Sequence, residues 1–332
     1  MKILLPLFAL SSIIFAADTA PHEFKGSIER FDPAFDKLVA PDAKVEMLAT
    51  GFKWSEGPVW FEGSVVFSDV PENTAYRWKE GMTAAEVFLK PSGLTSPSGG
   101  APGQGSNGLA RDAKGRLILC QHGDRRVARM LAPGKFETIA DRFEGMRFSS
   151  PNDLAIRKNG DIYFTDPPYG LDNLDASPLK EIPFHGVYRV ATDGKVTLLT
   201  KDIVFPNGIA FSPDERILYV AVSDGKATRV VAHDVKDDGT LANARTFFDA
   251  KPLKKPEAPG NCDGMKVDKD GNIWTTGPGG VLVISREGRL LGRLNTGEPT
   301  ANCNWGDDGS TLYITANMFL VRVKTLTKGS GW

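Results

Sequence analysis

The chain has 332 residues, and its 40 basic and 41 acidic residues leave a formal net charge of -1. This balance excludes the basic surface that nucleic acids and anionic membranes require, and it favours a small-molecule partner. The three cysteines, Cys120, Cys262 and Cys303, fit no zinc motif, and we interpret them as small buried hydrophobes. A disulfide between Cys262 and Cys303 is the alternative in an oxidising compartment.

The first 17 residues have the layout of a secretory signal peptide. In residues 1–17 a charged Lys2 is followed by an apolar run and then by small residues. The run is shorter than the roughly 20 residues of a membrane-spanning helix, although an uncleaved anchor is an alternative. We therefore expect a periplasmic or secreted protein without a membrane segment after cleavage. Residues 18–43 are expected to form a poorly packed N-terminal arm, and residues 44–332 a single catalytic domain.

A short pattern recurs along this domain: an apolar alternation, a turn with glycine or charged residues, and a second β-rich run. Each copy predicts a β-hairpin, because turns such as Asn-Gly and Asp-Gly lie between alternating or β-branched residues. The spacing between copies, roughly 40 to 55 residues, is that of propeller blades. The copies cover residues 58–69, 108–121, 153–166, 208–222, 264–277 and 305–316.

Six copies predict an all-β fold, a six-bladed β-propeller closed into a ring. A two-domain α/β chain is the competing architecture, but no segment shows sustained helical periodicity or a capped amphipathic helix. Residues 44–49 precede the first hairpin and could add a strand to the last blade. Such a strand would close the ring with the two ends of the domain together.

One oxygen-bearing side chain stands at the same place in every hairpin, seven or eight positions before the turn residue. A single Asn or Asp before Gly is usually a turn residue, but that explanation does not account for six at one register. Because the first strand of each repeat is innermost in a propeller, we expect these side chains to converge on the central axis at one mouth. These axial residues are Glu56, Asn107, Asn152, Asn207, Asp263 and Asn302.

Oxygen donors without Cys or His favour a hard cation. The carboxylates of Glu56 and Asp263 would neutralise a divalent ion, and Asn152 and Asn207 would add amide oxygens. The set predicts calcium on the axis, with magnesium, manganese or zinc as alternatives. The second strand of each hairpin returns to the same mouth, so its last residues and the loops after them should surround the ion. The predicted substrate-binding residues are Asn107, His122, Asn152, Asp166, Tyr169 and Asn302.

Several short strings resemble those of a known family in both order and register. They are SEGPVW at 55–60, SNGL at 106–109, HGDRRV at 122–127, SPNDL at 150–154, FTDPPYG at 164–170, FPNG at 205–208 and CDGM at 262–265. From about Val45 to its C-terminus the chain resembles the SMP-30/gluconolactonase/LRE family, in particular its gluconolactonase branch. The resemblance implies a six-bladed propeller with a divalent metal on its axis. It implies that Glu56, Asn207 and Asp263 are metal ligands, that Asn152 contacts metal or substrate, and that Asp263 is the general base.

These expectations combine into a reaction, the opening of a sugar lactone such as glucono-1,5-lactone to the aldonic acid. The metal would polarise the carbonyl and Asp263 would activate the attacking water. No Gly-x-Ser-x-Gly elbow provides a covalent nucleophile. A metal-dependent phosphotriester or other ester hydrolase is one alternative, and a non-catalytic periplasmic propeller that binds a sugar acid is another. The sequence leaves the particular lactone and the oligomeric state open.

Overall fold

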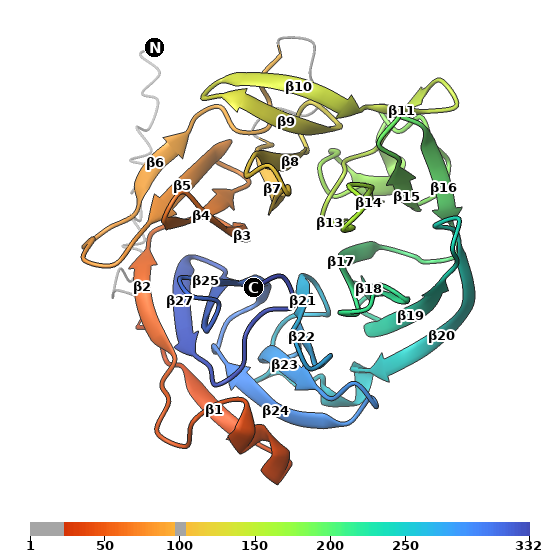
Figure 1. The fold of residues 1–332 in the computed structure, drawn as a ribbon. Helices are drawn as coiled ribbons and strands as arrows, with labels where there is room; N and C mark the ends of the chain where they lie inside the picture. The colour runs from red at the N-terminus through yellow and green to blue at the C-terminus, as the bar shows by residue number, and fades with distance from the viewer. Residues whose placement is uncertain (1–22, 97–103) are drawn as a thin grey trace, which may run out of the picture.

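The computed structural model describes residues 23–96 and 104–332. The predicted signal peptide, residues 1–17, lies outside the described residues. Six antiparallel sheets are arranged as blades around a central axis (Figure 1), which confirms the predicted all-β six-bladed propeller. Within the described ranges, no helix is long and apolar enough to cross a membrane.

The first three blades each contain four strands, ordered from the axis outward. Blade 1 consists of β3 (Ser55–Phe61), β4 (Ser64–Asp69), β5 (Thr74–Trp78) and β6 (Glu86–Leu89). Blade 2 consists of β7 (Ser106–Arg111), β8 (Leu117–Gln121), β9 (Arg126–Ala132) and β10 (Lys135–Ala140). Blade 3 consists of β13 (Leu154–Ile156), β14 (Ile162–Asp166), β15 (Gly186–Val190) and β16 (Val196–Thr200). The two-stranded ribbon of β11 (Arg142–Phe143) and β12 (Met146–Arg147) connects blades 2 and 3.

The last three blades follow the same plan, and two of them borrow a strand from the N-terminal region. Blade 4 consists of β17 (Pro206–Phe211), β18 (Ile217–Val222), β19 (Arg229–Val235) and β20 (Leu241–Asp249). Blade 5 consists of β21 (Met265–Val267), β22 (Ile273–Gly277), β23 (Gly280–Ile284), β24 (Leu290–Asn295) and β1 (Ser27–Arg30). Blade 6 consists of β25 (Thr300–Gly306), β26 (Thr311–Ala316), β27 (Phe319–Lys324) and β2 (Glu46–Thr50). The short 3-10 helices are η1 (Pro33–Lys37), η2 (Leu174–Ala176) and η3 (Lys251–Leu253).

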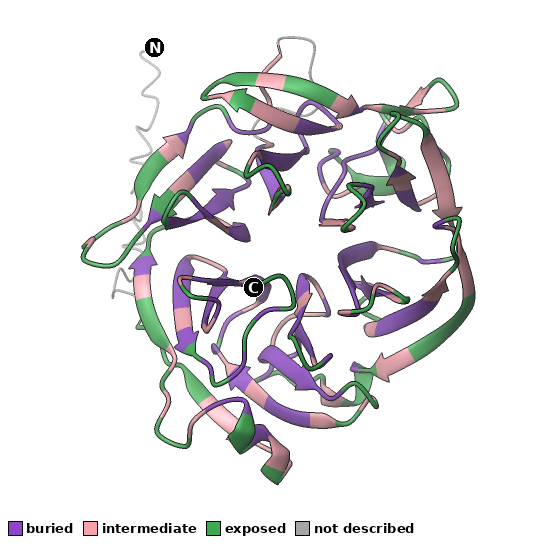
Figure 2. Cartoon of the chain, viewed as in Figure 1, coloured by how far each residue is buried: buried purple, intermediate pink, exposed green. Residues whose placement is uncertain are grey.

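The predicted hairpins form the inner half of every blade. Their turns contain a residue with positive φ, most often Gly, and the Glu215 turn of blade 4 adopts the same conformation. The inner strands are buried on both faces because each blade packs against its two neighbours, whereas the outer strands carry most of the exposed residues (Figure 2). One apolar cluster, for example, joins Cys120 of blade 2 to Phe164 of blade 3.

The ring closes as the sequence suggested, because β2 pairs antiparallel with β27 as the outermost strand of blade 6. Residues 23–43 of the expected arm, however, are not poorly packed, and residues 18–22 lie outside the described residues. Strand β1 pairs with β24, and Phe35 of η1 is fully buried in the cluster that joins blades 5 and 6. The aromatic ring of Phe35 lies against Gly292, where a side chain would clash with it. A four-residue strand and one buried aromatic ring are too short a pattern to recognise in a sequence.

All three cysteines are buried free thiols. Cys120, Cys262 and Cys303 each belong to an apolar cluster between blades. Their interpretation as small core residues is therefore confirmed, and the alternative disulfide between Cys262 and Cys303 is not formed.

Candidate active site

The axial side chains are positioned by irregularities at the start of the innermost strands. In blades 1, 2 and 4 the pairing with the second strand shifts register beside Glu56, Asn107 and Asn207. Such a bulge redirects a side chain away from the regular alternation of a strand. In blades 3 and 5 the innermost strand begins two residues after Asn152 and Asp263, so these side chains lie on the turn that enters the strand.

Five of the six axial residues line one cavity of about 500 Å³. Glu56, Asn107, Asn152, Asn207 and Asp263 come from five consecutive blades, so each blade from 1 to 5 contributes one side chain at or just before the start of its inner strand. The cavity rim includes aromatic and polar residues from the loops at this mouth. Those rim residues are Trp54, Gln104, His122, Tyr169, Ser223, Asn261 and Thr300.

Several side-chain oxygens in this cavity have no hydrogen-bond partner among the described residues. The Oδ1 atoms of Asn107, Asn152 and Asp263 are buried and make no hydrogen bond within the described structure. Buried oxygens of this kind are costly unless a ligand satisfies them. Asn207 is oriented instead by Ser223, because its Nδ2 donates to Ser223 Oγ at 2.9 Å.

These oxygens fit a hard cation better than a soft one. In the described part of the chain, no group of three His, Cys, Asp or Glu side chains has the arrangement of a metal site. A cation here must therefore draw on asparagine oxygens beside the two carboxylates. Such a mixture of carboxylate and amide oxygens suits calcium, magnesium or manganese and not a thiolate- or imidazole-bound metal.

The two carboxylates of the cavity, Glu56 and Asp263, are desolvated by burial. Burial, followed by the charge of Asp153, raises the pKa of Glu56 to about 8. Burial, followed by the charges of Glu56 and Asp153, raises the pKa of Asp263 well above its usual value. A site that raises carboxylate pKa values through desolvation and like charge is one that a bound cation would stabilise.

His122 and Tyr169 reach the cavity as the sequence predicted. His122 is 2 % exposed, and neither of its ring nitrogens has a hydrogen-bond partner among the described residues. Burial lowers its pKa to about 3, so the ring is neutral near pH 7. The ring of Tyr169 stacks on Phe205 with centroids 5.6 Å apart. Burial and the charge of Asp263 raise the pKa of Tyr169, which keeps its hydroxyl protonated beside Ser223.

The structure does not bring Asp166 to the cavity. Its carboxylate is fully buried and accepts the N–H groups of Ser149 at 2.9 Å and Ser150 at 2.7 Å. Desolvation raises the pKa of Asp166 to about 7 despite these bonds. The equivalent residue of blade 1, Asp69, likewise accepts the N–H groups just before Glu56. The last residue of the second strand thus anchors the segment that carries the axial side chain, and it does not contact the space where a substrate would bind.

Asn302 is also absent from the cavity wall. Its Nδ2 lies 3.2 Å from Glu56 Oε2 and 3.3 Å from Asp153 Oδ2, so it bridges two carboxylates beneath the cavity. Sequence reasoning overlooked Asp153, which is 1 % exposed. The signal was present, because Asp153 follows its axial Asn where Asn107, Asn207 and Asp263 are each followed by Gly. Ser223 was also overlooked, and no spacing rule pointed to it.

The chain has extensive similarity to known lactonases. Residues 54–318 match the family described as SMP-30/Gluconolactonase/LRE-like region. A gluconolactonase of Zymomonas mobilis is 36% identical, with 97% of this chain and 93% of that protein aligned. A pentonolactonase of Haloferax volcanii is 25% identical over 80% of this chain and 82% of that protein.

Solved structures agree with the sequence comparison. The structure of a gluconolactonase from Xanthomonas campestris matches with a TM-score of 0.77 and 32% sequence identity. That alignment covers 90% of this chain and 94% of the other. The family predicted from the short sequence strings is therefore confirmed: the chain belongs to the SMP-30/gluconolactonase/LRE-like family.

Proposed function

We propose that this protein is a lactone hydrolase that opens a sugar lactone to the aldonic acid with the help of a divalent cation, calcium by preference. The observation that carries the proposal is the set of buried oxygens without protein partners on Asn107, Asn152 and Asp263. The similarity to a gluconolactonase over almost the whole chain supports the substrate class.

Glu56, Asn152, Asn207 and Asp263 would hold the cation, because they come from four blades and line the same cavity. When bound, a divalent cation supplies a Lewis acid that polarises a carbonyl and stabilises negative charge on its oxygen. The protein keeps the ligand oxygens in place without it. Ser223 fixes the amide of Asn207, and the backbone N–H of Gly57 donates to Glu56 Oε2 at 2.7 Å.

Asp263 is proposed as the general base of the reaction. A water oxygen adds to the lactone carbonyl carbon, and the proton of that water passes to Asp263. The bond between this carbon and the ring oxygen then breaks, and the ring oxygen takes up a proton to become a hydroxyl group. In the absence of a cation, burial and the charges of Glu56 and Asp153 raise the pKa of Asp263, and its carboxylate is the group placed to accept this proton.

The rim of the cavity supplies groups that would orient the sugar. Asn107 Oδ1 and the two ring nitrogens of His122 are buried and have no hydrogen-bond partner in the described part of the chain, so they can bond the hydroxyl groups of a substrate. Tyr169 can donate from its protonated hydroxyl, and Trp54 offers an apolar face. Neutral donors and acceptors of this kind suit an uncharged polyhydroxy lactone better than a charged substrate.

The decisive experiment follows proton release with glucono-1,5-lactone in a pH-stat, before and after treatment with a strong chelator. Activity should disappear with the chelator and return with calcium, magnesium or manganese. Full activity of metal-free protein would refute the role of the cation. Hydrolysis of a phosphotriester without hydrolysis of the lactone would favour the alternative esterase. Binding of gluconate without turnover of either substrate would favour a sugar-acid binding protein.

We also propose that residues 1–17 direct export and are removed. The support is the arrangement of Lys2, an apolar run and small residues in the sequence. N-terminal sequencing of protein recovered from its native host should find a terminus near Asp18. A terminus at Met1 would refute export by cleavage.

A further inference from the structure

A second layer of polar residues lies on the axis directly beneath the candidate site. Asn302 donates from Nδ2 to both Glu56 Oε2 and Asp153 Oδ2. On the far side of Asp153, Lys266 Nζ lies 4.0 Å from the same Oδ2 atom and donates to the carbonyl of Met265 at 2.9 Å. A continuous series of contacts therefore runs from Glu56, in the site, to Lys266.

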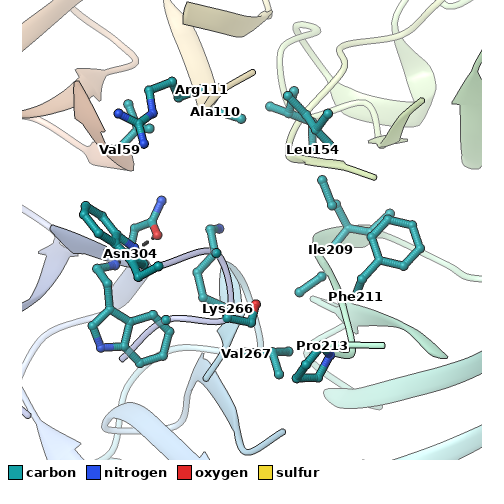
Figure 3. A pocket seen from close by; sticks show the side chains of 18 of the residues that line it. Val59, Ala110, Arg111, Leu154, Ile209, Phe211, Pro213, Lys266, Val267 and Asn304 are labelled. Carbon is teal, nitrogen blue, oxygen red and sulfur yellow. Dashed lines mark hydrogen bonds between the residues drawn. The ribbon is translucent and has the colours of Figure 1, made fainter. Parts of the chain in front are cut away.

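Lys266 separates this layer from a cavity at the opposite mouth of the propeller. That cavity has a volume of about 300 Å³, and its walls are largely apolar side chains of the inner strands, such as Val59, Leu154 and Ile209. The side chain of Lys266 extends into it (Figure 3). Lys266 is 21 % exposed and Asp153 only 2 % by side chain, so the ammonium group shields the carboxylate from this mouth.

The layer is closely packed. A Cβ atom added to Gly264 would lie 2.0 Å from Asn302 Cγ, and one added to Gly108 would lie 2.6 Å from Asp153 Oδ1. Neither position has room for a side chain. Asn302 Oδ1 in addition accepts the N–H of Cys303 at 2.9 Å, which fixes the direction in which the amide donates. The orientation of the bridge between the two carboxylates is thus determined by the fold.

Three carboxylates, those of Glu56, Asp153 and Asp263, are buried close together around this layer. Glu56, Asp153 and Asp263 interact electrostatically with one another. Lys266 is the cation that acts on both Glu56 and Asp153 and favours their ionised forms. With a divalent cation bound and all three carboxylates ionised, their negative charge would exceed that of the cation by one, and the ammonium group of Lys266, 4.0 Å from Asp153 Oδ2, corrects that excess.

We propose that Lys266 is the internal counter-ion of the axial carboxylates: it balances Asp153, holds the bridge from Asp153 through Asn302 to Glu56, and leaves two negative charges for a divalent cation. Lys266 is therefore a positioning residue that acts through Asp153. Its role in the metal-free protein is independent of the proposed function, whereas its effect on cation affinity rests on that function.

The first test measures thermal unfolding of chelator-treated protein for Lys266→Met, Lys266→Arg and Lys158→Met. Lys158 lines the same cavity but is exposed, so its variant controls for loss of a lysine at this mouth. Lys266→Met should lower Tm by about 3 to 6 °C more than Lys158→Met, because it leaves a buried carboxylate unpaired. Lys266→Arg should retain most of the stability.

Combining Lys266→Met with Asp153→Asn distinguishes a counter-ion from a packing residue. The Asn side chain keeps the shape of Asp153 and one of its two acceptor oxygens but carries no charge, so the double variant should regain at least half of the lost Tm. A double variant whose Tm losses simply add would overturn the proposal. Equal melting of Lys266→Met and Lys158→Met would overturn it as well.

The second test titrates calcium into the same variants by calorimetry at mildly alkaline pH. Lys266→Met should bind calcium on the order of tenfold more tightly, because a positive charge near the site is removed. Lys158→Met should bind calcium as the parent protein does. Unchanged affinity of Lys266→Met would overturn the effect on the cation. If the parent itself binds no divalent cation, the proposed function fails, while the melting experiment still decides whether Lys266 is a counter-ion.

Discussion

Replacing Asp263 by Asn separates the two roles that the proposed mechanism gives to this residue. The substitution keeps the shape of the side chain and one oxygen that can bind a cation, but it removes the charge and nearly all of the basicity. In the structure, Asp263 Oδ1 is free of protein partners, and Asn207 together with the N–H of Gly264 stabilises the carboxylate. The variant should therefore retain its backbone geometry while losing its ability to accept a proton.

The expected loss of activity follows from general-base catalysis. A positioned base typically contributes about 10² to 10⁴-fold, which corresponds to about 3 to 5 kcal/mol of transition-state stabilisation. Stability of the metal-free protein should change in the opposite direction. Burial and the like charges of Glu56 and Asp153 disfavour ionised Asp263, so a neutral side chain at this position should raise Tm in the presence of chelator.

The assay measures lactone hydrolysis by pH-stat at saturating cation, after a titration that determines how much cation each variant binds. Asp270→Asn is the matched control, because Asp270 is an exposed turn residue on the same blade. If Asp263→Asn, fully loaded with cation, hydrolyses lactone within about threefold of the parent, Asp263 is only a ligand. The base must then be another residue, with Glu56 the next candidate.

Three further predictions concern the remaining site residues. Glu56→Gln removes one of two ligand charges, so its calcium dissociation constant should rise by at least about tenfold, as measured by calorimetry. Asn152→Asp adds a charge beside the site and should tighten calcium binding without restoring activity to an Asp263→Asn background. His122→Asn should make the free energy of unfolding depend less on pH below pH 6.5. The pKa of His122 is about 3 in the folded chain and near 6.5 when unfolded, so its contribution is complete above pH 6.5 and is lost as the pH falls. Between pH 6.5 and 5 the parent should lose about 2 kcal/mol that the variant keeps, by denaturant titration of chelated protein.

The Glu56 and His122 predictions each have a control variant. Glu62→Gln changes a carboxylate in the turn after the strand that carries Glu56, and it should leave calcium affinity unaltered. His233→Asn alters a buried histidine of blade 4 that does not line the cavity and whose pKa burial also lowers, so it compares a second buried imidazole in the same assay. If the free energy of unfolding falls equally steeply with decreasing pH in the parent and in His122→Asn, the fold does not hold His122 neutral.

The sequence by itself determined the propeller and the direction of its axial residues. Turn sequences such as Asn159-Gly160 and Asp270-Gly271 favour hairpins locally, and six hairpins at a blade-like period can bury their faces only against one another. The repeat then puts one oxygen-bearing residue at the same position in every hairpin. For that reason the repeat alone assigns Glu56, Asn107 and Asn207 to one mouth of the ring.

The sequence could not assign roles that depend on neighbours distant along the chain. Asp166 ends the second strand of blade 3 and His122 directly follows that of blade 2, yet Asp166 accepts nearby N–H groups while His122 lines the cavity. The difference arises from which backbone donors happen to lie within reach. Similarly, the packing of Phe35 against Gly292 depends on a strand that joins blade 5 from the opposite end of the chain.

The layer beneath the site was decided by tertiary structure alone. Asn302 and Glu56 are 246 residues apart, and Asn302 and Asp153 are 149 apart, yet one amide nitrogen donates to both carboxylates. Local propensity cannot specify such contacts, because hydrogen bonds and electrostatic interactions act over a few ångströms in space, whatever the separation along the chain. Closure of the ring brings Lys266, Asp153, Asn302 and Glu56 within that range, and so places a fixed positive charge beneath the candidate cation site.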